Sequence, residues 1–224
     1  MKASLLFSKG LKTALIFACG TSINEHKDYI PSLIDKYTSV GVNRFPSKFA
    51  EYYAKDKKSM PVDYWIYSDT LGTRDFIIPY YDNQKILMES NIPNDVKILK
   101  DKNISVHLIY HGVSGLGMIK EGKYYLGGLG TTTLHAISFL YLVGFKNIVI
   151  FGMDNKVNDQ GVWEHFYHSS NNYKTQSNIS KINNQLEDYK EYVNLYKASN
   201  SSNINLDVVT IKEGEVSNGY FINL

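Results

Sequence analysis

The sequence predicts an α/β fold of the doubly wound, Rossmann-like type, with a mostly parallel sheet and helices on both faces. Apolar runs of strand length, rich in β-branched and aromatic residues, alternate with segments of helical spacing. This alternation is typical of parallel sheets whose strands are buried on both faces. The chain has 224 residues, of which 43% are hydrophobic, which is enough for one sizeable core. We therefore expect one domain, residues 1–224.

The first strand is expected at Thr13–Cys19, a continuous apolar run that ends in the turn Gly20-Thr21-Ser22. Further short strands are predicted at Ser39–Val42, Asp63–Tyr67, Ser105–Tyr110, Asn147–Phe151 and Leu206–Thr210.

Helical spacing predicts helices at Tyr29–Tyr37, Pro46–Lys55, Thr132–Val143 and Ile179–Ala198. The third is the best defined, because Thr131 to Thr133 offer hydroxyl caps at its start and Gly144 ends it.

Two segments fit neither the strand pattern nor the helix pattern. The glycine-rich 111–130 and the polar, aromatic 155–178 are expected to be long loops, and 155–178 is the candidate lid over a site.

Composition excludes several classes of protein. The single cysteine, Cys19, cannot form an internal disulfide framework or a multi-cysteine zinc site. The net charge of +2 gives no strong attraction to nucleic acid or membranes, and no apolar run reaches the length of a membrane helix. We expect a cytoplasmic protein without an integral membrane segment. The first turn has one glycine and matches neither the dinucleotide-binding fingerprint nor the P-loop.

In a doubly wound sheet the ligand binds outside the carboxyl ends of the strands, so the residues that follow each strand form the candidate site. They are Gly20, Thr21, Ser22, Asn43, Arg44, Ser68, Asp69, Gly152 and Asp154, joined by Thr131, Thr132 and Thr133 at a helix start.

These residue types suit a nucleotide. The first turn offers backbone N–H groups and two hydroxyls to a phosphate, although it is equally a tight turn in which Ser22 caps a helix. Asn43 suits a base or ribose, and Arg44 suits a phosphate. Asp69 and Asp154 are candidate ligands for Mg²⁺ on a diphosphate, or for ribose hydroxyls.

Two histidines in the second long loop are candidate general bases. His165 and His168 follow Glu164, and an imidazole on a loop over a donor site is suited to take a proton near neutral pH. His135, on an apolar helix, is most simply interpreted as a packed core histidine.

The first turn, Asn43-Arg44-Phe45, the block Thr132–Asp154 and the later His-Phe-Tyr-His-Ser together resemble the small bacterial sialyltransferases that decorate lipo-oligosaccharide. The block is also similar to the Rossmann-like family of 6-hydroxymethylpterin diphosphokinase and motility-associated glycosyltransferases. The resemblance to the sialyltransferases implies that Asn43 and Asp154 contact the donor and that His168, or failing that His165, is the catalytic base. The sequence departs from that family at Thr132-Thr133, which replace a serine-glycine.

The leading hypothesis is a glycosyltransferase, sialyltransferase-like and inverting, that moves a sugar from a nucleotide-sugar donor to a hydroxyl of a glycan, a small molecule or a modified DNA base. It requires no cofactor. The first alternative is a Mg²⁺-dependent diphosphotransferase that uses Asp69 and Asp154 as metal ligands. The second is a non-catalytic nucleotide-binding protein. A homo-oligomer is compatible with all three.

Overall fold

The computed structural model describes residues 13–53, 62–68, 85–89, 105–113, 115–128, 131–159, 162, 164–167, 179–212 and 215–217. Within these ranges ten strands form one sheet in the order β10-β9-β8-β1-β2-β3-β4-β5-β7-β6, and β11 and β12 form a separate pair. All neighbours in the large sheet are parallel except β6 and β7. The doubly wound α/β class predicted from the sequence is confirmed.

The central strands are β1 (Thr13–Phe17), β2 (Thr38–Val42), β3 (Tyr64–Tyr67) and β8 (Asn147–Phe151), and every one of their residues is buried. The other strands of the sheet are β4 (Lys85–Glu89), β5 (Ser105–Val113), β6 (Gly117–Lys120), β7 (Lys123–Gly127), β9 (Asn194–Lys197) and β10 (Asp207–Val208). All six strands expected from the sequence begin within one residue of an observed strand, namely β1, β2, β3, β5, β8 and β10.

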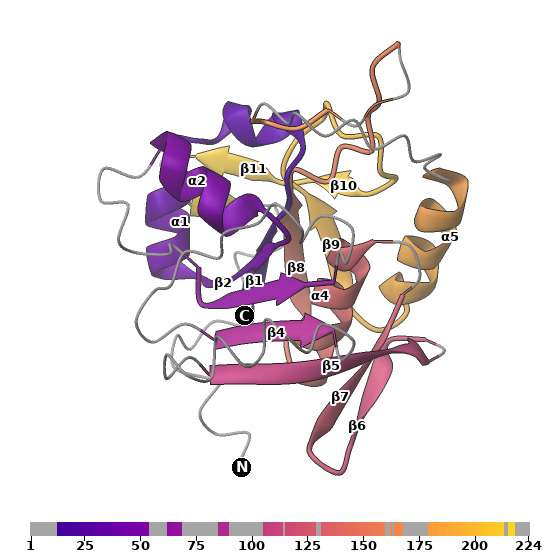
Figure 1. Ribbon diagram of the computed structural model, residues 1–224. Coiled ribbons are helices and arrows are strands. Elements are labelled where there is room, and N and C mark those ends of the chain that lie inside the picture. Colours follow the sequence, from indigo (N-terminus) through magenta and orange to yellow (C-terminus); the bar gives the residue numbers. More distant parts are fainter. Residues whose placement is uncertain are drawn as a thin grey trace.

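Helices cover both faces of the sheet, as Figure 1 shows. The 3-10 helix η2 (Thr21–Glu25), α1 (Ile30–Lys36) and α2 (Phe45–Tyr53) pack on the face that carries Leu15 and Phe17. The helices α4 (Thr132–Leu142) and α5 (Ile179–Lys190) pack on the opposite face, which carries Ala14 and Ile16. Successive side chains of a strand point to opposite faces, so β1 supplies both layers of the core.

Three sequence-based expectations are wrong. The predicted loop 111–130 contains β6 and β7, an antiparallel hairpin whose turn residues Glu121 and Gly122 have φ of 52° and 73°. The predicted helix Ile179–Ala198 ends at Lys190, and its last part contains β9, in which Leu195 is buried, as is Val193 just before the strand. The predicted strand Leu206–Thr210 is divided between β10 and β11 (Thr210–Lys212), which pairs with β12 (Glu215–Ser217).

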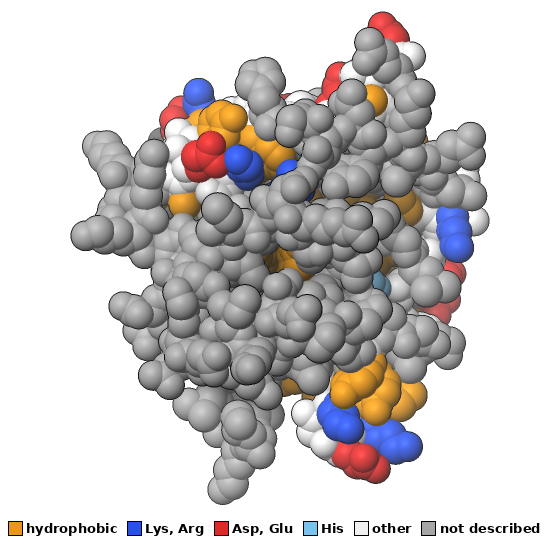
Figure 2. Space-filling model, in the orientation of Figure 1, with side chains coloured by type: hydrophobic (Ala, Val, Ile, Leu, Met, Phe, Trp, Pro, Cys, Tyr) orange, Lys and Arg blue, Asp and Glu red, His pale blue; other side chains and the backbone are white. Residues whose placement is uncertain are grey.

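The β6–β7 hairpin projects from the body of the protein at the end of the sheet, where Figure 2 shows hydrophobic and charged side chains together. Met118 and Ile119 are about half exposed there. No helix in the described ranges is long and apolar enough to cross a membrane.

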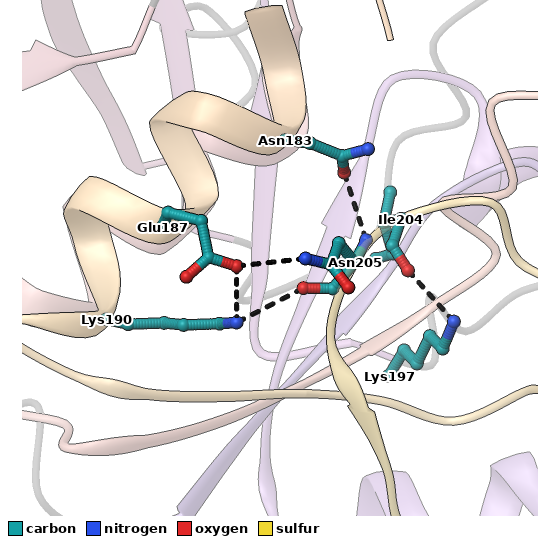
Figure 3. Close-up of polar contacts among 6 residues, drawn as sticks. All are labelled: Asn183, Glu187, Lys190, Lys197, Ile204 and Asn205. Atoms are coloured by element: carbon teal, nitrogen blue, oxygen red, sulfur yellow. Dashed lines mark hydrogen bonds and ion pairs between the residues drawn. The ribbon is translucent and has the colours of Figure 1, made fainter. Parts of the chain in front are cut away.

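The helix α5 is joined to the segment after β9 by an exposed polar network, which Figure 3 shows. Glu187 accepts hydrogen bonds from Lys190 at 2.6 Å and from the side chain of Asn205 at 3.3 Å, and Lys190 also donates to the Asn205 carbonyl oxygen. Asn183 accepts from the Asn205 backbone N–H, and Lys197 donates to the Ile204 carbonyl oxygen. This network fixes the loop that passes the carboxyl end of β9.

Candidate functional site

The strand order places a topological switch point between β1 and β8. From β1 the chain continues to β2 and β3 on one side, whereas β8 leads to β9 and β10 on the other side. The connections that follow β1 and β8 therefore run in opposite directions along the sheet. Doubly wound proteins bind their ligands at such a point. The candidate site therefore lies at the carboxyl ends of β8, β1, β2 and β3.

At the switch point itself the polar groups bind one another. Asp154, which is buried, accepts hydrogen bonds from the Ser22 backbone N–H at 2.7 Å, from the Thr21 hydroxyl at 3.2 Å and from the Ser22 hydroxyl. The Gly20 N–H donates to the Gly152 carbonyl oxygen at 2.7 Å. We call Gly20, Thr21, Ser22, Gly152 and Asp154 the Asp154 clamp, because it joins the ends of β1 and β8.

Glycine is required at both ends of the clamp, for different reasons. A β-carbon on Gly20 would lie 2.5 Å from the Asp154 Oδ2 atom, so only glycine permits the close approach. Gly152 has a φ of 68°, in the left-handed region that side chains disfavour. The turn after β1 is thus shaped around the Asp154 carboxylate, and the Ser22 N–H that the sequence offered to a phosphate is bound to that carboxylate.

A second polar cluster lies at the ends of β2 and β3. The Thr132 hydroxyl is 2.9 Å from Asn43 Oδ1 and 2.6 Å from the Ser68 hydroxyl, which is 3.3 Å from His135 Nδ1. The other ring nitrogen of His135, Nε2, is 2.8 Å from the Gly128 carbonyl oxygen. We call Asn43, Thr132, Ser68, His135 and Gly128 the Asn43 relay.

The backbone holds both ends of the relay. Asn43 has a φ of 49°, its N–H donates to the Ile66 carbonyl oxygen at 2.9 Å, and its own carbonyl oxygen accepts from Trp65 Nε1 at 2.6 Å. Thr132 is the first residue of α4, whose N-cap Thr131 accepts a hydrogen bond from the Thr133 N–H. Because α4 connects β7 to β8, its amino end lies at the carboxyl edge of the sheet.

Cys19 lies between the clamp and the relay. Its Sγ atom is 3.8 Å from the carbonyl oxygen of Val42, the residue before Asn43. Burial raises the pKa of the Cys19 thiol to about 12, against which hydrogen bonds and the charge of Arg44 act only partly. The side chain is therefore a neutral thiol at this edge and is not a ready nucleophile.

His165 is held at the same edge by its neighbours. The Phe166 N–H donates to the Cys19 carbonyl oxygen at 3.0 Å, and the Phe166 ring packs against Tyr53 of α2 with centroids 6.1 Å apart. The His165 ring stacks on Tyr167 at 5.1 Å. Part of the predicted lid is thus packed on the body of the protein.

The surroundings of His165 favour its neutral form. Burial lowers the pKa of the imidazole below 6.5, a hydrogen bond with the Cys19 backbone opposes this, and the Arg44 charge lowers the pKa further. A neutral imidazole near pH 7 has a free lone pair and can accept a proton. The effect of Arg44 also indicates that its guanidinium lies near this ring.

The structure brings the predicted site residues together in two groups. Gly20, Thr21, Ser22, Gly152 and Asp154 meet in the clamp, while Asn43, Ser68 and Thr132 meet in the relay, and Thr131 and Thr133 form the cap of α4 next to it. Asp69 and His168 lie outside the described residues.

Sequence reasoning missed the part that His135 plays. The residue is buried, as a core histidine would be, but both of its ring nitrogens have polar partners at the edge of the sheet. The available signal was its position three residues after Thr132, which places both side chains on one side of α4.

No cluster of three His, Cys, Asp or Glu side chains that could hold a metal ion occurs in the part of the chain that the structure describes. Asp154, one of the two metal ligands of the diphosphotransferase alternative, has hydrogen bonds to both of its carboxylate oxygens. Asp69, the other, is not among the described residues.

Comparisons with known proteins add one result on the fold. No protein-family model and no curated protein matches the sequence. The structure is similar to that of the MAf glycosyltransferase from Magnetospirillum magneticum AMB-1, with a TM-score of 0.56 and 11% sequence identity. The match covers 88% of this chain and 32% of that chain, so this chain spans about a third of that protein. At this identity the similarity shows a shared fold.

Proposed function

We propose that the protein is a glycosyltransferase that binds a nucleotide-sugar across the carboxyl ends of β1, β2 and β3. The observation that carries the proposal is the Asn43 relay at the carboxyl edge of the sheet, where the Phe166–Cys19 hydrogen bond also holds the segment with His165. Side chains that suit a nucleotide and a histidine that is neutral at pH 7 lie at the edge where this fold binds ligands. The likeness to a glycosyltransferase fold supports the same reading.

The roles follow from the chemistry of each group. Asn43, which the Thr132 hydroxyl positions, binds the nucleotide, and Arg44 neutralises charge on its phosphate as the bond to the sugar breaks. His165 takes the proton from the acceptor hydroxyl, whose oxygen attacks the anomeric carbon of the sugar while the nucleotide leaves with the bonding electron pair. One displacement of this kind inverts the configuration at that carbon. His168 is the second candidate for the base.

The first experiment is a thermal-shift panel of CMP, UMP, UDP and GDP, each with and without Mg²⁺, followed by the sugar conjugates of any nucleotide that binds. We expect one nucleotide to stabilise the protein without metal. Stabilisation only with Mg²⁺ would support the diphosphotransferase alternative. The absence of any shift would contradict a nucleotide site, and CMP as the preferred nucleotide would support the sialyltransferase-like donor.

Variants then separate binding from chemistry. Thr132→Val removes a hydroxyl at nearly constant volume and should weaken nucleotide binding roughly fivefold or more, the size of one hydrogen bond. Thr210→Val, on the exposed strand β11, is the matched control and should bind normally. His165→Gln should bind the nucleotide normally and lower kcat about 100-fold or more. A larger effect in His168→Gln would transfer the role of base to His168.

A further inference from the structure

The hydrogen atoms of the Asn43 relay can be counted from its distances. The Gly128 carbonyl oxygen only accepts hydrogen bonds, so His135 Nε2 must carry a proton. Thr132 and Ser68 each have one hydroxyl proton to donate, and His135 Nδ1 either donates or accepts according to its protonation state. The direction of each hydrogen bond in the relay therefore fixes the direction of the next hydrogen bond.

Two arrangements satisfy all of these bonds. In the first, Asn43 Oδ1 accepts from Thr132, Thr132 accepts from Ser68, and Ser68 accepts from an imidazolium at His135. In the second, a neutral His135 accepts from Ser68, Ser68 accepts from Thr132, and Thr132 accepts from the amide nitrogen of Asn43. The second requires only that the Asn43 amide turn over by 180°, because its two ends have nearly the same shape.

The two arrangements present opposite groups to the site. Asn43 is partly exposed, and among the described residues only one end of its amide has a side-chain partner, the Thr132 hydroxyl. The backbone of Asn43 is fixed at both its N–H and its carbonyl oxygen, so the amide can turn without moving the chain. With His135 charged, the free end of Asn43 is a hydrogen-bond donor. With His135 neutral, the free end is an acceptor.

We propose that His135 is a positioning residue that decides, through Ser68 and Thr132, whether Asn43 offers a donor or an acceptor to the bound nucleotide. The proposal rests on the function proposed above. His135 itself touches no ligand in this scheme. It acts across the relay, and it makes the preference of the site for one edge of a nucleobase dependent on the protonation of the imidazole.

Three tyrosines that the structure describes in this layer stay neutral near pH 7. Burial raises the pKa of Tyr64 on β3 to about 12, and burial also raises the pKa of Tyr124 on β7 and of Tyr189 on α5. The Tyr189 hydroxyl lies beside Gly128, next to the histidine end of the relay. None of these three phenols changes charge where a histidine does, so they do not cause a pH response between about pH 5 and about pH 8.

The relay is tested on the ligand-free protein by nitrogen-15 NMR between about pH 5 and about pH 8. We expect the ring nitrogens of His135 and the side-chain amide of Asn43 to shift with one common midpoint. In Ser68→Ala the amide of Asn43 should no longer follow His135, because the link is cut while the Thr132–Asn43 contact remains. The amide of Asn194, which donates to Asn147 at 2.9 Å elsewhere in the sheet, is the internal control and should not follow.

Three results would overturn the proposal: a His135 ring that keeps one protonation state over this range, an Asn43 amide that does not respond in the wild type, and an Asn43 amide that still responds in Ser68→Ala. The conservative variant His135→Gln, which keeps a donor toward Gly128, should fold and should abolish the response of Asn43.

Nucleotide binding tests the consequence for the site. CMP and UMP have the same phosphate and ribose, so the titration of the phosphate cancels in the ratio of their affinities. The base of CMP has a ring acceptor where the base of UMP has a donor, and Asn43 offers a donor when His135 is charged. The affinity for CMP divided by the affinity for UMP should therefore rise roughly fivefold from pH 8 to pH 5.5 in the wild type. In Ser68→Ala this ratio should stay constant. A constant wild-type ratio with measurable binding contradicts the proposal. If neither nucleotide binds, the proposed function is wrong, and the NMR result still decides whether the relay reverses.

Discussion

The Asp154 clamp and the Asn43 relay lie on neighbouring strands of one sheet edge, yet they are built from opposite kinds of polar group. The carboxylate of Asp154 can only accept, so its hydrogen bonds have one possible direction. Each hydroxyl of the relay both donates and accepts, so its direction can reverse. The clamp is therefore suited to hold the edge in one shape, whereas the relay is suited to respond to a ligand.

The largest expected effect comes from breaking the clamp. Asp154→Asn keeps the shape of the side chain but places an N–H₂ group where donors of Ser22 or Thr21 point, which leaves buried donors without acceptors. We expect a loss of about 3 kcal/mol in the free energy of unfolding, measured by urea denaturation. Asp159→Asn, at an exposed position, is the matched control and should be neutral. Equal stability of the two variants would show that the clamp does not contribute to the free energy of unfolding.

A smaller loss is expected when the clamp is crowded. Gly20 has φ −69° and ψ 161°, which any residue can adopt, so Gly20→Ala acts through the contacts of its β-carbon, which would lie 2.5 Å from Asp154 Oδ2 and 2.6 Å from the Gly152 carbonyl oxygen. We expect about 2 kcal/mol of destabilisation. Gly122→Ala provides the contrast, because Gly122 has no neighbour within 4 Å but a φ of 73°, and only backbone strain of about 1 kcal/mol remains. Thermal unfolding of both variants separates crowding from strain.

A third effect is expected from His165, which lies at the same sheet edge as the clamp and the relay and makes stability depend on pH. Its pKa is lowered in the folded protein, so the unfolded chain binds the proton at a higher pH than the folded chain does. The stability contribution is fully present above about pH 6.5 and is lost as the pH falls through the lowered pKa. His165→Gln should flatten this part of the profile of unfolding free energy. An unchanged slope would mean that the ring is already solvated.

The smallest effect is expected in the exposed network of α5. Lys190 and Glu187 are 2.6 Å apart, but their side chains are 36% and 49% exposed, so water competes for both charges. Lys190→Ala should cost only about 0.5 kcal/mol or less in urea denaturation. A cost as large as that of Asp154→Asn would remove the distinction between buried and exposed polar networks.

The fold was predictable where strands are buried on both faces. Ala14 to Phe17 and Ile148 to Phe151 are continuous apolar runs, which are typical of the centre of a parallel sheet. Strand β4 and the β6–β7 hairpin were missed. Lys85–Glu89 has polar residues at both ends and a short apolar centre, and the glycines around Met118 indicate a loop until the pairing of the two strands is known.

The site was predictable as a set of positions but not as a set of bonds. The rule for carboxyl ends of strands selected Asn43, Ser68 and Asp154 from the sequence alone. It could not show that Asp154 would be satisfied by Ser22, since those residues are 132 positions apart. It also could not separate His135 from an ordinary core histidine, because burial and hydrogen bonding depend on neighbours that only the fold supplies.

The position of β1 has a consequence for synthesis of the chain. The strand that leaves the ribosome first among those described becomes a central one, with β2 on one edge and β8 on the other. While the chain grows, β1 and β2 can pair, but the second edge of β1 stays open until Asn147–Phe151 has emerged. An open apolar edge of this kind invites pairing with other chains. Nascent chains arrested before β8 should therefore depend on chaperones, and those released after β8 should not.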